Sequence, residues 1–168
     1  FDEPNAEKNY ADLVNKIPWA QRTHGVKGFD SAHKACAKAS KTNRFITIDG
    51  DNIVDETFWD QTLEIDPDLH EKAIWSWSSK NIINGLVYGN GGIKLWPKAP
   101  TLVMKTHENA EAETSAIDFC WDLDYKQMND IYSINYPNAS PYQAFRAGFR
   151  EGVKMSLAEG NKVKPEPG

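Results

Sequence analysis

The pattern of apolar and polar residues predicts three helices. Residues 6–16 place their apolar side chains on one helical face, and Pro18 ends that segment. Residues 28–40 predict a second helix, whose alanines face a sheet. The clearest helix covers 144–157, because it follows Ser140-Pro141-Tyr142-Gln143, a capping box with proline at the first helical position.

Apolar or alternating runs between these helices predict strands. They lie at residues 21–26, 44–49, 73–79, 101–106 and 119–125. Residues 81–98 predict a loop with a short helix, a glycine turn and a further strand. Helix and strand alternate in the first part, which is typical of an α/β fold with parallel strands. We therefore expect a Rossmann-like, mostly parallel sheet flanked by helices, with a C-terminal helix.

The length and the net charge of the chain limit the number of domains and the possible functions. The 168 residues suit one domain, which we place at 1–160, followed by a polar tail at 161–168. A net charge of −5 argues against a protein that coats nucleic acid. Residues 49–71 hold nine Asp or Glu and neither Lys nor Arg. Such a run is usually a solvated face, but a local acidic cleft also suits a divalent metal.

The strongest chemical signal is Asp49-Gly50-Asp51. Its two carboxylates directly follow a buried strand, and ligands of open α/β sheets gather beyond the carboxyl ends of strands. Hard cations prefer carboxylate oxygens and often bind together with substrate phosphates. Glycine between the acids permits a tight turn. A plain turn is the alternative reading, because Asp, Gly and Asn are common turn residues.

Other candidates carry weaker signals. The segment 88–92 has three glycines around Asn90, which suits either a phosphate-binding or sugar-binding loop or a hairpin turn. His107 follows an expected strand and is a candidate metal ligand, whereas His33 reads as a packed helix residue. Cys36 and Cys120 are not spaced in the way that metal-binding cysteines are. We interpret them as buried thiols of a protein in a reducing compartment. The pattern shows no membrane span, so we expect no membrane partner and a cytoplasmic location.

Taken together, these blocks resemble a known enzyme class. FITIDGDN after AHKACAKAS resembles the core of GT-A-type nucleotide-sugar glycosyltransferases, where a strand ends in a D-x-D motif that holds Mn²⁺ or Mg²⁺. DEPNAEKNYADL, HGVKGFDSAH, NIINGLVYGNGGIKLWPK and SPYQAFRAGFREGVKMSL together resemble, more narrowly, a phage glycosyltransferase-like group. That group is linked to glycosylation of hydroxymethylated DNA bases. The resemblance covers most of residues 1–157.

The resemblance implies roles for individual residues. Asp51 would bind the metal directly, and Asp49 would face the metal or the ribose of the donor. The remaining donor-binding residues implied by position are Asp2, Glu3, Lys27, Gly91 and Gly92. The first strand of the family fold is expected to be missing, because the chain begins where that strand would end. No motif selects a catalytic base among Asp118, Asp122 and Asp124.

The implied activity is metal-dependent transfer of a sugar from a nucleotide-sugar donor, with UDP-sugars favoured, to an acceptor hydroxyl. A DNA acceptor would need a basic surface, for which we expect a patch of Lys80, Lys94, Lys98 and Lys105. If the chain is phage-encoded, its location is the host cytoplasm. Two alternatives stay open: a non-catalytic binding module of a phage or virion protein, and another metal-dependent α/β enzyme such as a phosphatase or nucleotidyltransferase.

Overall fold

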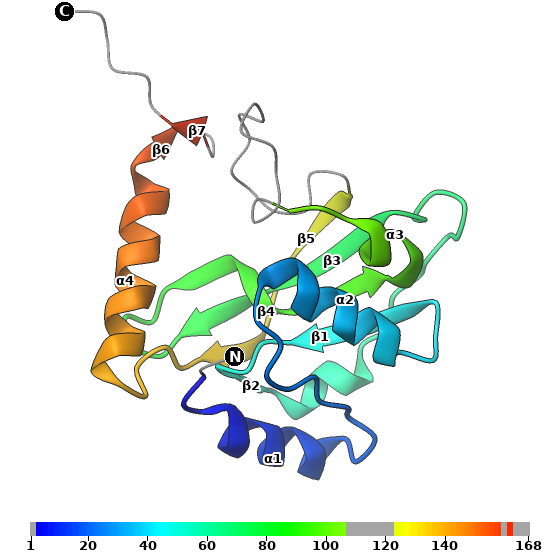
Figure 1. Ribbon diagram of the computed structural model, residues 1–168. Helices are drawn as coiled ribbons and strands as arrows, with labels where there is room; N and C mark the ends of the chain where they lie inside the picture. Colours follow the sequence, from blue (N-terminus) through cyan, green and yellow to red (C-terminus); the bar gives the residue numbers. More distant parts are fainter. Residues whose placement is uncertain (1–2, 107–122, 159–160, 163–168) are drawn as a thin grey trace, which may run out of the picture.

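The computed structural model describes residues 3–106, 123–158 and 161–162 of the 168-residue chain (Figure 1). The helices are α1 (Ala6–Lys16), α2 (Phe29–Ala39), the 3₁₀ helix η1 (Glu56–Asp60), α3 (Lys98–Val103) and α4 (Pro141–Met155). The strands are β1 (Arg44–Ile48), β2 (Asn52–Val54), β3 (Ala73–Asn81), β4 (Val87–Pro97), β5 (Asp124–Asn135), β6 (Leu157–Ala158) and β7 (Asn161–Lys162). Within these ranges, no helix combines the length and the apolar character needed to cross a membrane.

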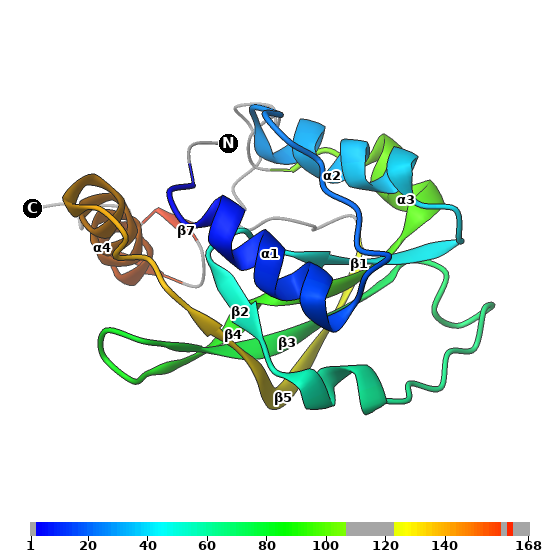
Figure 2. The same cartoon turned by 90° about the horizontal axis from the view of Figure 1, so that it is seen from below.

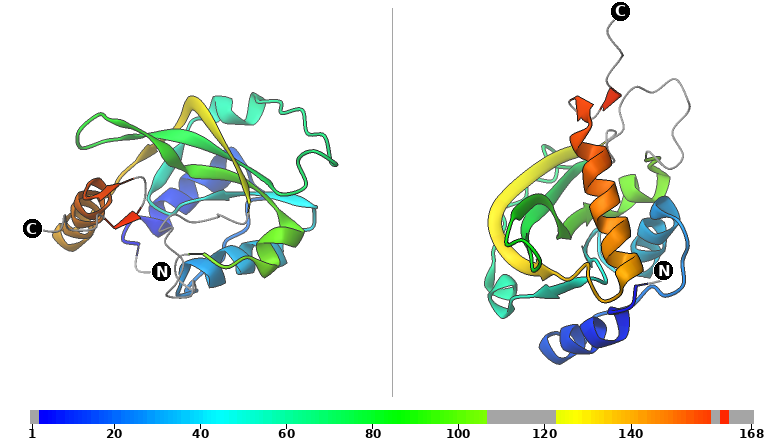
Figure 3. Two further views of the ribbon diagram at one scale, coloured as in Figure 1. Left: turned by 90° about the horizontal axis from the view of Figure 1, so that it is seen from above. Right: turned by 90° about the vertical axis from the view of Figure 1, so that its left-hand side faces the viewer.

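The main sheet is mixed and mostly antiparallel, so the expected Rossmann-like, mostly parallel sheet is wrong. Its strand order is β1-β4-β3-β5-β2, and only β3 and β5 run parallel. The sheet curls into a nearly closed, barrel-like shape, and β5 arcs around it in the right-hand view of Figure 3. The physical reason is that β4 pairs antiparallel with both of its neighbours, β1 and β3. A crossover through a helix would have placed a parallel strand beside β1, and β4 takes that place instead.

The expected strand at 21–26 is irregular backbone. Its side chains bind the neighbouring helices instead of another strand. Arg22 pairs with Glu7 of α1 at 2.9 Å, and Thr23 Oγ1 lies 3.2 Å from the sulfur of Cys36 on α2. This segment is therefore a connection between two helices, and the helix-strand alternation that predicted parallel strands is interrupted here.

Two further expectations about local structure are wrong. Residues 101–106 are not a strand, because α3 occupies the first half of this segment, and Thr101 Oγ1 donates to the carbonyl oxygen of Pro97 at 2.6 Å. This bond from a hydroxyl to the carbonyl four residues earlier is a helical contact. The glycine-rich segment at 88–92 is part of strand β4 and not a turn. The turn lies earlier, between β3 and β4.

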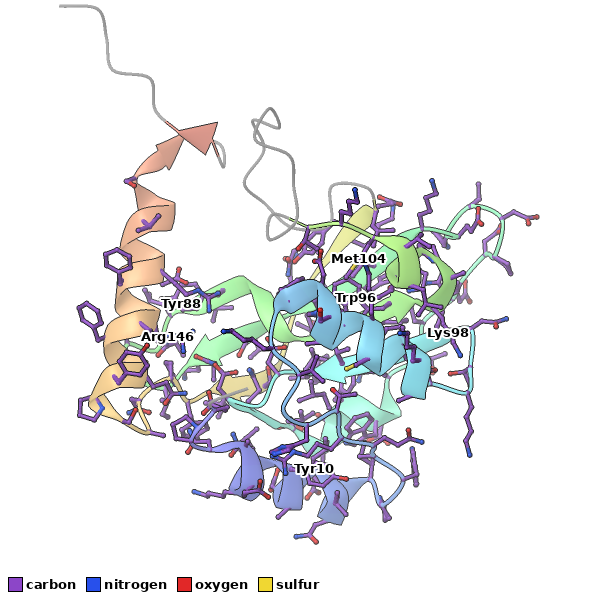
Figure 4. All side chains as sticks on the ribbon, viewed as in Figure 1. Tyr10, Tyr88, Trp96, Lys98, Met104 and Arg146 are labelled. Carbon is purple, nitrogen blue, oxygen red and sulfur yellow. The ribbon has the colours of Figure 1, made fainter. Side chains whose placement is uncertain are left out.

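The helices predicted at 6–16, 28–40 and 144–157 form, whereas the short helix expected within 81–98 does not, because the end of β3, a turn and β4 occupy residues 81–97. Helix α2 packs with α3 over one part of the sheet, and α1 packs beside β2 (Figures 1 and 2). Figure 4 shows Trp96 of β4 and Met104, which follows α3, close together beside α2. Helix α4 stands at the edge of the molecule. The helices thus do not cover both faces of the sheet as an α/β fold requires.

Two apolar clusters form the core, one on each face of the sheet. The cluster under α2 and α3 consists of Ala37, Phe45, Ile74, Trp96, Met104 and Leu123. The cluster on the opposite face consists of Val54, Phe58, Ala73, Trp75, Trp77 and Ile93. Strand β3 is buried from Ala73 to Ser79 because its side chains alternate between the two clusters. The sheet is therefore a rigid support for the segments that join its strands.

Candidate functional site

Asp49, Gly50 and Asp51 join the two edges of the sheet. They connect β1 to β2, and these strands stand at opposite ends of the strand order. A residue spans at most about 3.6 Å of extended chain, so this link holds the two edges within roughly 15 Å. The curl of the sheet follows from this short connection. Both acidic residues consequently lie on the seam where the barrel-like sheet nearly closes.

Four hydrogen bonds fix the backbone of this link. Asp49 N donates to Gly92 O of β4 at 2.9 Å, and Asn52 N donates to Asp49 O at 3.0 Å. Asn9 Nδ2, on the buried face of α1, donates to Gly50 O at 2.8 Å. The amide of Tyr136, just after β5, donates to Asp51 O at 2.8 Å. The turn is thus held by α1, β4 and the end of β5 together.

The carboxyl group of Asp51 lies in an environment that disfavours its charge. Burial, together with the negative charges of Asp49 and Glu3, raises the pKa of Asp51 to about 6. Hydrogen bonds from Asn135 and Asn52 act in the opposite direction, and the one from Asn52 Nδ2 to Asp51 Oδ1 is 2.8 Å long. The site therefore carries more negative charge than its described neighbours compensate.

Glu3 connects this link to the C-terminal helix. Its two carboxylate oxygens each accept a hydrogen bond from Gln143 Nε2 of α4, at 2.8 Å, and Oε1 also accepts from Asn5 N at 3.0 Å. A Cβ atom on Gly50 would lie 3.3 Å from the Cγ of Glu3. Glycine at position 50 thus lets Glu3 pack closely against the link.

On its other side, Asp49 faces α2. His33 Nδ1 lies 2.9 Å from Phe29 O, and the ring of His33 packs between Phe29 and Trp96, with centroid distances of 4.1 and 4.6 Å. Burial lowers the pKa of His33, while the Phe29 carbonyl and the charge of Asp49 raise it less. Sequence reasoning placed His33 on a helix but gave no signal that it lies near Asp49, because α2 and β1 meet only through the tertiary fold.

The glycines expected near the donor have a packing role in β4. A Cβ on Gly91 would lie 2.3 Å from the carbonyl oxygen of Trp77, and one on Gly92 would lie 2.1 Å from Asn52 Nδ2. Gly92 is part of the site because its carbonyl oxygen holds Asp49. Donor binding by either glycine stays a prediction.

The other predicted site residues lie apart from the link or outside the described residues. Lys27 is exposed in the connection between α1 and α2, and Asp124 is exposed in β5, where it pairs with Lys126 at 2.7 Å. Within the described residues, no bond or charge interaction joins either of them to Asp51. The predicted residues outside the described ranges are Asp2, His107, Asp118 and Asp122.

The expected lysine patch is incomplete. Lys94 is buried at 6% exposure within the sheet, and its Nζ donates to Gly91 O at 2.6 Å. Lys98, labelled in Figure 4, is half-buried and donates to Ser40 O at 2.6 Å. Lys80 and Lys105 are exposed. Two of the four lysines are thus engaged in holding the fold.

The described residues supply only part of a metal shell. Among them, no three His, Cys, Asp or Glu side chains converge closely enough to hold a metal ion. Two shallow hollows in the surface of the described part also lie elsewhere, one beside Glu64 and His70 and the other beside Asp12 and Trp59. A cation at the link would therefore need further ligands in addition to the Asp49–Asp51 pair.

Known proteins provide no family for this chain. Comparisons with protein-family models, with curated proteins and with solved structures found no match.

Proposed function

We propose that this chain is a metal-dependent glycosyltransferase whose Asp49–Asp51 link binds the nucleotide-sugar donor through Mn²⁺ or Mg²⁺. The observation that supports it best is the partly buried carboxyl group of Asp51, whose pKa is raised to about 6 beside two further acids. Such uncompensated charge is what a bound cation would neutralise. The D-x-D resemblance then selects glycosyl transfer among metal-dependent reactions.

The side chains at the link fit a hard cation. Carboxylate oxygens are the ligands preferred by Mg²⁺ and Mn²⁺, and Mg²⁺ is often bound by only one or two carboxylates together with substrate phosphates. Asp51 and Asp49 would hold the ion, and the donor diphosphate would supply further ligands. When bound, the cation would neutralise charge on the leaving nucleoside diphosphate.

The chain's own residues would position these groups. Asn9 holds the Gly50 carbonyl, and Glu3, fixed by Gln143, packs on the link. These contacts keep both acids on one short turn, which limits the reorganisation needed when the donor binds. The acceptor hydroxyl would lose its proton to a carboxylate. A hydroxymethylated DNA base as acceptor, and a cytoplasmic location, stay predictions from the resemblance.

Calorimetric titration with UDP-glucose, with and without Mn²⁺, tests this function. We expect binding that requires Mn²⁺ and that Asp51→Asn abolishes. Asp60→Asn is the matched control, because Asp60 is an exposed acid in η1. Unchanged metal-dependent binding in Asp51→Asn would refute the assignment of the link as the donor site.

Turnover separates the enzyme from the alternative of a binding module. We expect the chain with Mn²⁺ to release UDP slowly from UDP-glucose in the absence of an acceptor, with water as the attacking hydroxyl. Binding without any release of UDP, also after an acceptor screen that includes hydroxymethylated DNA, supports the non-catalytic module. Hydrolysis of phosphate esters or nucleoside triphosphates instead would support another metal-dependent enzyme, a phosphatase or a nucleotidyltransferase, as the sequence left open.

A further inference from the structure

Helix α4 presents its apolar side to solvent. Among the side chains of α4 that the structure describes, the partly buried ones are small or polar, namely Gln143, Ala144, Ala147 and Glu151. The opposite stripe carries Tyr142, Phe145, Phe149 and Val153, and its three aromatic side chains are 63–69% exposed. Figure 4 shows ring side chains of α4 on the side away from the sheet. A helix on the surface of a globular protein typically has the reverse arrangement, with its apolar stripe toward the core.

The stripe is ordered internally. The rings of Phe145 and Phe149 stack with centroids 6.1 Å apart, and the guanidinium of Arg146 lies 5.6 Å from the centroid of the Tyr142 ring. The helix is held to the body at its first turn, where Gln143 binds Glu3. The helix is thus tied to the body at its first turn, and the apolar stripe runs along one of its sides.

A second apolar surface lies at the same end of the molecule. The tip between β3 and β4 exposes Ile82, Ile83, Leu86 and Val87, each by 45–58%. In Figures 1, 2 and 3 this tip and α4 point to the same end of the molecule. The tip is well defined, because Asn81 N donates to Leu86 O at 2.9 Å and Ile83 N donates to Asn81 Oδ1 at 2.8 Å. We call these eight residues the apolar end: Ile82, Ile83, Leu86, Val87, Tyr142, Phe145, Phe149 and Val153.

The area of the apolar end suits a dimer. A fully exposed aromatic side chain offers about 200 Å² and an aliphatic one about 100 Å², so these residues expose about 650 Å² per copy. Two copies would then bury about 1,300 Å², which lies within the range of specific protein interfaces, about 1,200–2,000 Å².

We propose that two copies of this chain associate through the apolar end, with α4 of each copy covering the β3–β4 tip of the other. A dimer with two-fold symmetry covers both surfaces of each copy at once, because each copy contributes one α4 helix and one β3–β4 tip. The stripe spacing at positions 142, 145, 149 and 153 is that of a helix lying in an apolar groove. This inference does not depend on the proposed glycosyl transfer.

Sedimentation velocity of the full chain tests the proposal. Between about 1 and about 100 μM, we expect the mass to rise from 18.9 kDa toward twice that value, or to equal twice that value throughout if the dimer is tight. Phe145→Glu/Phe149→Glu and, separately, Ile83→Glu/Leu86→Glu should both remain monomers over the whole range. Leu69→Glu/Val103→Glu is the matched control, because these side chains are 76% and 78% exposed elsewhere, and it should still dimerise.

Two results would overturn the proposal. One is a monomer of the unsubstituted chain at every concentration, and the other is a dimer that survives both pairs of substitutions. Flotation with vesicles of phosphatidylglycerol and phosphatidylcholine distinguishes a lipid surface as occupant, and binding to them by a chain that stays monomeric would also refute the second copy. Circular dichroism of each variant checks folding, which we expect to be unchanged because the substituted side chains are exposed.

Discussion

Asn52 of β2 occupies the space that a side chain at Gly92 of β4 would need, with its Nδ2 only 2.1 Å from the position of a Cβ there. These two residues face each other across the seam at which the curled sheet nearly closes. Asn52 cannot turn away freely, because Nδ2 donates to Asp51 at 2.8 Å and Oδ1 accepts from Ser79 Oγ at 3.1 Å. Packing at the seam and the orientation of Asp51 are therefore coupled.

Gly92→Ala should destabilise the protein by about 2–3 kcal/mol, because overpacking costs about 1–3 kcal/mol and a hydrogen bond of Asn52 would be weakened. Urea unfolding measures this loss. Gly148→Ala is the control, since a Cβ there meets nothing within 4 Å and Gly148 lies within α4. We expect that control to gain about 0.5–1 kcal/mol. Equal stability of both variants would contradict the packing described at the seam.

The raised pKa of Asp51 predicts a pH dependence of stability. Because the native pKa is about 6 and the ordinary value is 3.8, the folded state binds the proton more tightly than the unfolded state. The contribution of Asp51 to the free energy of unfolding is thus present at low pH. It falls by about 3 kcal/mol as the pH rises through the range from about 4 to 6 and beyond. Asp51→Asn should be more stable than the unsubstituted chain at pH 7.5, and this difference should vanish near pH 4. Urea unfolding at both pH values measures it, and a constant difference would contradict the shifted pKa.

The bond from Asn9 to the Gly50 carbonyl predicts a loss on substitution. Asn9→Ala should cost about 1 kcal/mol, because it removes the partly buried hydrogen bond that the Asn9 side chain donates to Gly50. We also expect weaker Mn²⁺-dependent binding of UDP-glucose, since the Gly50 turn carries both acids. Asn15→Ala, at an exposed position of the same helix, should be neutral or slightly stabilising. Equal effects at the two positions would show that Asn9 does not hold the turn.

Cys36 should react slowly with alkylating reagents in the folded protein. Burial raises the pKa of this thiol above its usual value, and the contact with Thr23 lowers it less. Since the thiolate is the reactive form, we expect alkylation by iodoacetamide at pH 8 to be about tenfold or more slower than in urea. The measurement uses a Cys120→Ser background, which leaves Cys36 as the single thiol. Comparable rates in the folded and unfolded chain would show that the thiol is accessible.

The sequence predicted local structure better than the arrangement of the strands. Helices α1, α2 and α4 and strands β1 and β3 follow from side-chain periodicity, which depends on near neighbours. Strand direction depends on which distant strand pairs with which, and no local pattern encoded that β4 would lie between β1 and β3. The glycines at 91 and 92 suggested a turn, although they serve close packing inside β4.

The candidate site was predictable only in part. Asp49 and Asp51 were found from their position after a strand, and the structure places them on one short link. Glu3 was named from the resemblance, and its charge does act on Asp51. Asn9, Asn135 and Gln143 were missed, because they reach the link from α1, β5 and α4 and carry no motif. Only the tertiary fold brings them there.

The bond between Gln143 and Glu3 joins residues that are 140 positions apart. Such a contact closes nearly the whole chain into one loop, and the entropy of that closure must be offset before the bond can form. During synthesis, the ribosome would release Glu3 long before Gln143 exists. Glu3 can therefore be held beside the link between β1 and β2 only after the segment that carries α4 has been made.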